Sequence, residues 1–290
     1  MKQAILSLFT ETSLHAGTGQ MTGVIDLPIQ REAHTDWPCV YGSAVKGAMR
    51  VLADSKNQEW VDEVFGPEEG NTHAGSVAIS DARLLLLPVR SLTGHFKWVT
   101  CPALLERLRR DYRRLGLDGS FLNKGLAQLD DAHAFVSKQE EGKQKEGDLF
   151  LEEFRFQTIP IDLQDIINNI SQFADIDENA LKEQLVIVNN EIFSHLARYA
   201  TPVNAHIAID NTTKTTKPGA LWYEETLPAD SLLYTTVVAF KSRKTDSEKE
   251  ANDILQDILG LFSEHPYLQI GGNETVGMGW CKVKSLRGGE

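Results

Sequence analysis

The residues best suited to chemistry flank a glycine-rich stretch near the amino terminus. His15 precedes Ala-Gly-Thr-Gly, and Asp26 lies just beyond Gly23. An imidazole and a carboxylate in such a loop can assist proton transfer or hold a divalent ion. A plainer interpretation exists for each, because Asp26 beside Pro28 suits a turn and a single histidine at a strand end is commonly just hydrogen-bonded. The two residues by themselves leave both interpretations open.

A second glycine-rich segment, residues 271–279, lies near the carboxyl terminus. Gly272 and Gly277 have the spacing of a phosphate loop, but Met278 follows where nucleotide hydrolysis needs a Lys-Ser/Thr pair. The dinucleotide fingerprint does not fit either, because a strand is expected to follow and that fingerprint opens a helix. Two interpretations remain: backbone N–H groups that approach a phosphodiester, or a tight hairpin with positive φ. Both use the four glycines Gly271, Gly272, Gly277 and Gly279.

Cations gather on two expected helices. Ser43 is a good N-cap residue for a helix over residues 44–53, which places Lys46 and Arg50 four residues apart on one face. A helix over residues 102–115 turns five arginines away from its apolar stripe: Arg107, Arg109, Arg110, Arg113 and Arg114. These arginines suit either a phosphate backbone or a solvated helix face.

Composition indicates a folded protein and limits its partners. The chain has 290 residues, 41% hydrophobic and 24% charged, which is close to globular averages. A net charge of −12 argues against a nonspecific polyanion binder. The acid is concentrated in residues 125–194, however, and residues 81–124 hold 9 basic against 4 acidic side chains. A locally positive groove is therefore compatible with the acidic whole.

Several other classes of protein are excluded. No apolar run approaches the roughly 18 residues that a membrane helix needs. Three scattered cysteines are too few for a zinc site, and their odd number fits a reducing compartment, so we expect the cytoplasm. No nucleophile elbow and no His-Glu-x-x-His zinc helix occurs, which leaves hydrolytic triads unsupported.

The expected elements form one elaborated α+β domain over residues 1–290. Their order is strand, helix, strand, strand, helix, strand, which matches a ferredoxin-like β-α-β-β-α-β sheet with large insertions. These core elements are expected at residues 3–10, 44–53, 76–87, 232–240, 248–263 and 279–283. Residues 90–200 are expected to be a mostly helical insertion, with one helix over 178–199. Residues 201–223 suggest a projecting hairpin whose polar tip, residues 211–219, holds Lys214 and Lys217.

Several motifs resemble the RAMP (repeat-associated mysterious protein) superfamily. They are Leu-His-Ala-Gly-Thr-Gly at 14–19, Gly-Val-Ile-Asp-Leu-Pro-Ile-Gln-Arg-Glu at 23–32, Tyr-Gly-Ser-Ala-Val-Lys-Gly at 41–47 and the closing glycine loop. Two runs are more specific: Asp-Leu-Pro-Ile-Gln-Arg-Glu at 26–32 and Gly-Ala-Leu-Trp-Tyr-Glu-Glu at 219–225. These are similar to the backbone subunits of Cmr effectors, the type III-B CRISPR interference complexes. The resemblance spans residues 5 to about 283.

The resemblance implies an RRM-like palm with a β-hairpin thumb. Copies would assemble head to tail along a guide CRISPR RNA, together with other Cmr subunits. Asp26 would cut target single-stranded RNA, His15 would lie near it, and Glu224 or Glu225 would approach the cut site. RNA contacts are expected from Ser43, Lys46, Arg50 and the four glycines, and thumb contacts from Ile207, Ile209, Lys214, Lys217 and Trp222. One departure is Tyr41 where the family commonly has proline, together with Ala44-Val45 in place of Ser-Leu.

The RNA cleavage implied by the resemblance needs few catalytic groups from the protein, because the target RNA supplies its own nucleophile. A kinked target strand can bring a ribose 2′-OH in line with its own phosphodiester. Asp26 would assist the displacement, holding a divalent cation that we expect to be Mg²⁺, and one fragment would end in a cyclic phosphate. The alternative is a noncatalytic RNA-binding subunit of the same complex, in which Asp26 is only a loop residue. An RRM that binds RNA through sheet aromatics is a third interpretation, but the characteristic aromatic run is missing.

Overall fold

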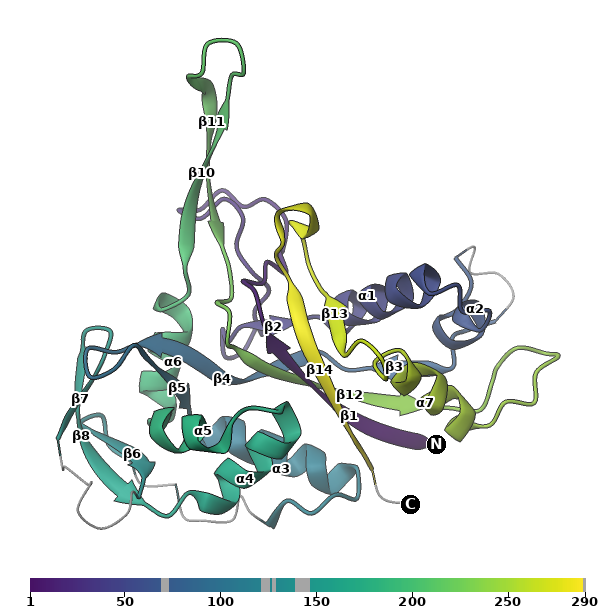
Figure 1. Ribbon diagram of the computed structural model, residues 1–290, viewed down its shortest axis with the longest axis horizontal. Helices are drawn as coiled ribbons and strands as arrows, with labels where there is room; N and C mark the ends of the chain where they lie inside the picture. Colours follow the sequence, from purple (N-terminus) through teal and green to yellow (C-terminus); the bar gives the residue numbers. More distant parts are fainter. Residues whose placement is uncertain (69–72, 121–125, 127–128, 139–146, 289–290) are drawn as a thin grey trace.

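The computed structural model describes residues 1–68, 73–120, 126, 129–138 and 147–288. They form a mixed α+β protein around one large sheet, which confirms the expected fold class at that level. Figure 1 shows a broad body from which one hairpin projects, with the two chain ends close together. None of the helices in the described part of the chain is long and apolar enough to cross a membrane.

The centre of the sheet joins the first strand to the last third of the chain. Strands follow the order β13-β14-β1-β12-β4, and every neighbouring pair is antiparallel. Two short strands are added beside this path, β3 on β12 and β2 on β4. The bounds are β1 (Lys2–Thr10), β2 (Cys39–Val40), β3 (Val77–Ile79), β4 (Ala82–Arg90), β12 (Leu232–Ala239), β13 (Tyr267–Gln269) and β14 (Trp280–Arg287).

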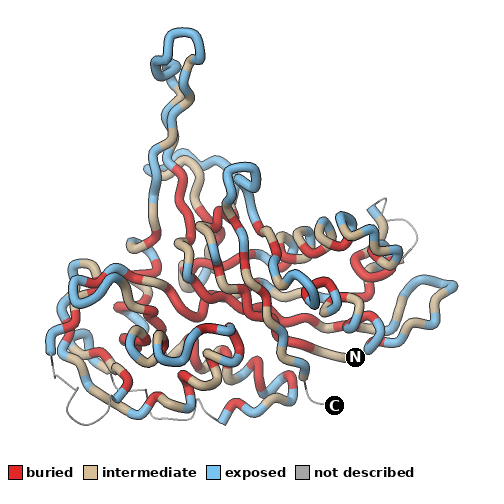
Figure 2. The backbone as a smooth tube through the Cα atoms, viewed as in Figure 1, coloured by how far each residue is buried: buried red, intermediate tan, exposed pale blue. Residues whose placement is uncertain are grey.

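Helices cover both faces of this sheet. Residues 4–8 of β1 are all buried although successive side chains point to opposite faces. Ser7 points toward one helix, α4, and its hydroxyl donates to the Phe173 carbonyl at 2.8 Å. Figure 2 shows the central strands as the buried core. The packed helices are α1 (Gly42–Ser55) on β3 and β13, α7 (Ala251–Gly260) on β1 and β12, α3 (Pro102–Arg114) on β4 and α4 (Gln164–Ala174) on β1 and β14. The central strand β1 is therefore covered on both faces and offers no open surface for RNA binding through aromatic side chains.

The insertion between residues 90 and 200 is mixed rather than mostly helical where the structure describes it. Its strands extend the sheet beyond β4 in the order β5-β9-β6-β8-β7. They are β5 (Phe96–Thr100), β6 (His133–Ser137), β7 (Asp148–Leu151), β8 (Phe154–Ile161) and β9 (Leu185–Ile187). The helices beside α3 and α4 are α5 (Glu178–Gln184) and α6 (Asn190–Tyr199), and the short α2 (Val61–Phe65) follows α1 earlier in the chain.

The prediction of a single helix over residues 178–199 is wrong, because β9 separates α5 from α6. Leu185, Val186 and Ile187 are all buried and pair with β5 and β6, where β-branched side chains pack well. Asn189 then starts a new helix, since its side-chain oxygen accepts the Ile192 N–H at 2.8 Å. Helical spacing of the apolar residues continued across this break, which is why the pattern concealed it.

The projecting hairpin consists of β10 (Val203–Ile209) and β11 (Thr216–Glu225), which form a sheet of their own (Figure 1). Its tip is shorter than the expected residues 211–219. Asp210 closes the turn, because its Oδ1 accepts the N–H groups of Thr212 and Thr213 at 2.8 and 3.0 Å. Lys214 stays in the turn with φ 58°, whereas Lys217 belongs to β11.

Candidate functional site

Asp26 lies where the first glycine-rich loop meets the base of the hairpin. Its Oδ2 accepts the Tyr223 N–H at 2.8 Å. The next residue, Leu27, is held on both sides, since it donates to the Tyr223 carbonyl and accepts from the Glu225 N–H, each at 3.0 Å. Asp26 is half-buried, and no donor among the described residues contacts its Oδ1. One carboxylate oxygen therefore fixes the residue and the other remains available to a ligand.

His15 is anchored to the same stretch of β11. Its Nδ1 lies 2.8 Å from the Glu225 carbonyl oxygen, which can only accept, so Nδ1 donates. The ring packs on Gly17, where a Cβ would lie only 2.6 Å from Nε2. Tyr223 and Glu225 are two residues apart, about 7 Å along a strand. The anchors of Asp26 and His15 are thus close, although the His15 side chain itself is buried.

The two adjacent glutamates point in different directions. The Glu224 carboxylate accepts the side-chain amide of Asn273 at 2.5 Å and lies 3.9 Å from His15 Nδ1. Glu225 instead faces Arg31, whose Nη2 lies 2.5 Å from its Oε1. Glu225 as a whole is only 2% exposed. Glu225 is therefore enclosed by protein and is not placed to contact a substrate directly.

The glycine loop at residues 271–279 is held onto His15. Gly271 has φ 85°, and a Cβ there would lie 2.3 Å from the His15 carbonyl oxygen. Gly279, at φ 84°, would meet the Ile270 carbonyl oxygen at 2.0 Å. These distances require glycine for structural reasons.

Three of the four glycine amides of this loop already have acceptors within the protein. Gly272 donates to the His15 carbonyl, Gly277 to Glu274 and Gly279 to Ser13, each at 2.9 Å. Glu274 belongs to a short 3₁₀ turn, η2 (Glu274–Val276). The geometry favours the tight-hairpin interpretation, and the expected phosphodiester contacts of these three amides are not supported.

The two cations of α1 differ in their surroundings. Arg50 is neutralised, because it donates to Asp62 at 2.7 Å and to the Gly66 carbonyl. Lys46 is half-buried and has no acidic partner among the described residues. Burial, followed by the positive charges of Arg50 and Arg243, lowers the pKa of Lys46. Of the two, Lys46 is the one that an anion can approach, and the predicted RNA contact of Arg50 is not supported.

The start of α1 also differs from the prediction. The helix begins at Gly42, one residue before the proposed N-cap Ser43. Asp81 supplies the cap from another part of the chain, since its Oδ1 accepts the Gly42 N–H at 2.7 Å. Ser43 lies exposed in the first turn, where a side-chain contact with RNA is still open to it.

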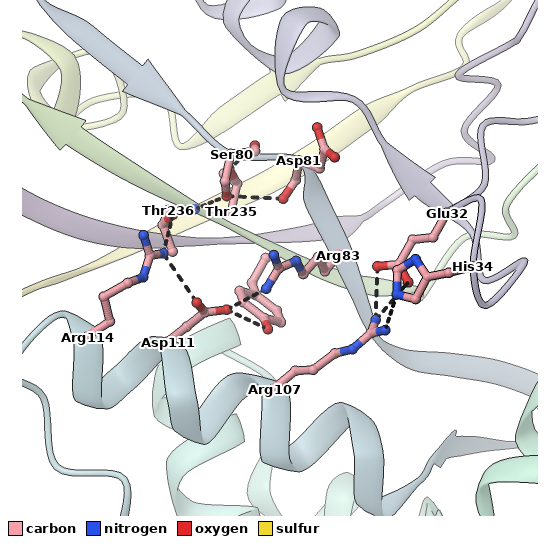
Figure 3. Close-up of polar contacts among 11 residues, drawn as sticks. Glu32, His34, Ser80, Asp81, Arg83, Arg107, Asp111, Arg114, Thr235 and Thr236 are labelled. Atoms are coloured by element: carbon pink, nitrogen blue, oxygen red, sulfur yellow. Dashed lines mark hydrogen bonds and ion pairs between the residues drawn. The ribbon is translucent and has the colours of Figure 1, made fainter.

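Three of the five arginines of α3 are engaged in contacts within the protein. Figure 3 shows Arg107 reaching from α3 to Glu32 and His34, and its Nη1 lies 2.8 and 2.9 Å from the two Glu32 oxygens. Arg114 reaches Asp111 at 3.2 Å and Thr236 at 2.9 Å. Arg109 pairs with Glu106 on the same helix at 2.6 Å. A phosphate-binding face is thus not available from these three arginines, although Arg110 and Arg113 are exposed.

The hairpin has two faces of different character. Four side chains on one face are 41–55% exposed: Ile207, Ile209, Leu221 and Tyr223. On the other face, His206 stacks on Trp222 with ring centroids 5.4 Å apart. Sequence reasoning singled out Ile207, Ile209 and Trp222 but missed Leu221 and Tyr223, which the alternation along β11 indicates.

A metal site is not preassembled in the described residues, where no three His, Cys, Asp or Glu side chains gather as ligands. Magnesium sites often use one or two carboxylates together with phosphate oxygens. Asp26, with its available Oδ1, fits a cation shared with a nucleic acid rather than one held by the protein alone.

Comparisons with known proteins place the chain in a family. The model of the RAMP superfamily matches residues 8–282. The CRISPR system Cmr endoribonuclease Cmr4 of Pyrococcus furiosus is 34% identical over 292 residues, covering 98% of this chain and 95% of that protein. The Cmr subunit Cmr4 of Saccharolobus solfataricus is 26% identical, covering 95% and 94%. The crystal structure of oligomeric Cmr4 from Pyrococcus furiosus has a TM-score of 0.75 at 28% identity, covering 100% of both chains. The chain therefore belongs to the RAMP superfamily and, within it, to the Cmr4 family.

Proposed function

We propose that this chain is the RNA-cutting backbone subunit of a cytoplasmic type III-B CRISPR (Cmr) complex. It binds guide CRISPR RNA and cleaves complementary target RNA. One observation carries the proposal: the Asp26 carboxylate is fixed by the Tyr223 N–H at the hairpin base and keeps Oδ1 available. The relationship to a protein named as a Cmr endoribonuclease supports the same reaction class.

The proposed RRM-like palm rests on the centre of the sheet. The antiparallel order β14-β1-β12-β4 is the strand order of a ferredoxin-like fold, with α1 after the first strand and α7 after the third. The insertion adds helices on the second face. The projecting hairpin, with its exposed apolar face, supports the thumb assignment, since apolar side chains can wedge between stacked bases.

Cleavage by this arrangement would depend on alignment. The thumb splays the target strand, so that a ribose 2′-OH lies in line with its own phosphodiester. Asp26 Oδ1 accepts the 2′-OH proton while the 2′-oxygen bonds to phosphorus, and the 5′-oxygen leaves and takes up a proton. The products are a 2′,3′-cyclic phosphate and a 5′-hydroxyl. A divalent cation, expected to be Mg²⁺, would be held by Asp26 and phosphate oxygens and would neutralise charge there.

Guide binding is proposed to be sequence-independent. Lys46 contacts a guide phosphate, and contacts of this kind position RNA without reading bases, whereas pairing with the guide selects the target. Copies of the chain bind head to tail along the guide together with other Cmr subunits. The oligomeric crystal structure of the Pyrococcus protein supports self-assembly.

The test uses the assembled complex with guide RNA, Mg²⁺ and end-labelled target RNA. We expect a ladder of regularly spaced cuts, with cyclic phosphate on one fragment of each pair. A non-complementary RNA is the control and is expected to stay intact. A complementary target that also stays intact would favour the noncatalytic alternative.

A further inference from the structure

Arg31, five residues after Asp26, is half-buried and makes four hydrogen bonds through its two terminal nitrogens. Its Nη1 donates to the carbonyl oxygens of Asp36 and Ala197 at 2.7 and 2.9 Å. Its Nη2 donates to Glu225 Oε1 at 2.5 Å and to the Thr201 hydroxyl at 3.3 Å. The Arg31 side chain is 15% exposed and that of Glu225 is 3% exposed. The guanidinium therefore joins α6, the start of the hairpin and the end of β11.

Glu225 connects this ion pair to the loop of Asp26. Its Oε2 accepts the Ile29 N–H at 3.1 Å, and its Oε1 also accepts the Thr201 hydroxyl at 2.6 Å. Ile29 is three residues beyond Asp26. The loop is thus tied to β11 twice, through the Glu225 carboxylate at Ile29 and through the backbone on both sides of Leu27.

Removing the guanidinium would leave the buried Glu225 charge without a counter-charge. An ionised carboxylate in that position is strongly unfavourable, so it gains a proton or turns toward water. Either response weakens the bond to the Ile29 N–H, because a neutral or displaced acceptor binds that group less well. The loop can then shift relative to the hairpin, and Asp26 shifts with it.

We propose that Arg31 and Glu225 are positioning residues, a clamp that sets the Asp26 carboxylate relative to the hairpin base. Neither residue touches RNA. The inference rests on the proposed function, in which Asp26 assists cleavage. It replaces a direct role of Glu225 at the cut site with an indirect one through the loop.

The chain supplies a matched control in the neighbouring ion pair, Arg107 with Glu32. Its arginine is buried to a similar degree, at 14% exposed, while its glutamate is more exposed than Glu225, at 13%, and the oxygen–nitrogen distance is 2.8 Å. Arg107 lies on α3, and Figure 3 shows it paired with Glu32, the residue that follows Arg31. Arg107 contacts Glu32 and His34, whereas the Ile29 and Tyr223 N–H groups bond to Glu225 and Asp26, so replacing Arg107 alone removes a buried charge without removing either acceptor.

The first arm measures single-turnover cleavage at saturating target, in complexes with equal guide occupancy. Arg31→Gln and Glu225→Gln are each expected to lower the rate about 10- to 100-fold, the scale of an ångström-sized misplacement. Arg107→Gln is expected to stay near wild type. The double variant Arg31→Gln/Glu225→Gln is expected to be no slower than the slower single variant, because it buries no unpaired charge.

Two cleavage results would overturn the clamp. A catalytic Glu225 predicts that Arg31→Gln cuts near the wild-type rate while Glu225→Gln and the double variant do not. A general folding defect predicts that Arg107→Gln is as slow as Arg31→Gln.

The second arm needs no cleavage, so it separates this inference from the proposed function. Hydrogen exchange of the full chain without target RNA reports on the Ile29 and Tyr223 amides. We expect both to exchange faster in Arg31→Gln and to keep wild-type protection in Arg107→Gln. Unchanged protection in Arg31→Gln would overturn the clamp, whether or not wild-type complexes cut RNA. Absence of cutting by wild type would instead refute the proposed function alone.

Discussion

At the scale of single residues, Lys46 and Arg50 show why a cation's partners matter more than its position. Arg50 is bound by Asp62, whereas burial, followed by the charges of its positive neighbours, lowers the pKa of Lys46. We expect Lys46→Glu to weaken guide binding about equally for unrelated guides and to lower the salt slope by roughly one unit. Arg50→Gln is the matched control and should leave the slope unchanged. Filter binding across salt concentrations measures both, and sequence-selective loss in Lys46→Glu would contradict the assignment.

The three cysteines lead to a second prediction at this scale. Cys39, Cys101 and Cys281 are all free and buried, and burial raises the pKa of each thiol to about 12. At pH 8 only about one thiol in ten thousand is then the reactive thiolate. The folded protein should resist iodoacetamide at that pH and react with it after urea unfolding. Rapid labelling of the native protein, followed by mass spectrometry, would show that the thiols are accessible.

At the scale of elements, the hairpin separates binding from alignment. Of the two lysines predicted for the tip, only Lys214 lies in the turn, so shortening the turn removes little positive charge. Replacing residues 211–215 with Gly-Gly should largely spare guide binding. The spacing of cuts should blur, because the kink that aligns each 2′-OH relaxes. Sequencing gels of cleaved target measure this, and an unchanged ladder would place the RNA elsewhere.

Elements with a long, regular apolar pattern were predictable. The strand expected over 232–240 corresponds to β12, which is buried along almost its whole length. The helix expected over 248–263 corresponds to α7, whose buried residues lie on one face. The strands of the insertion, residues 90–200, were not predictable, since they have three to eight residues and several pair with strands far along the chain. Short apolar runs such as β9 fit a helix and a strand equally well.

The site was predictable only in part for a related reason. Asp26 stands out by its type and its glycine-flanked loop, and the hairpin by its turn residues. The Arg31–Glu225 pair joins residues 194 positions apart, and spacing carries no information about such contacts. The same holds for the loop glycines, whose amides find partners such as the His15 carbonyl only in the folded chain.

At the scale of the whole molecule, the proposed head-to-tail assembly makes the isolated chain prone to open-ended association. A contact between two different faces propagates unless a rotation closes it. We expect the isolated protein to form concentration-dependent head-to-tail oligomers, which guide RNA limits to a defined length. Light scattering over a range of concentrations measures this. A strict monomer at high concentration, with and without guide RNA, would contradict it.

The central claim, that Asp26 cuts target RNA from within an assembled guide complex, is tested most directly by one substitution. Asp26→Asn keeps an oxygen that can accept the Tyr223 N–H and removes the charge. Target cleavage by the reconstituted complex is measured beside guide binding and complex size. The account predicts a loss of cleavage of roughly 10²- to 10⁴-fold, with assembly and guide binding near wild type. Undiminished cutting by a fully assembled Asp26→Asn complex would contradict it.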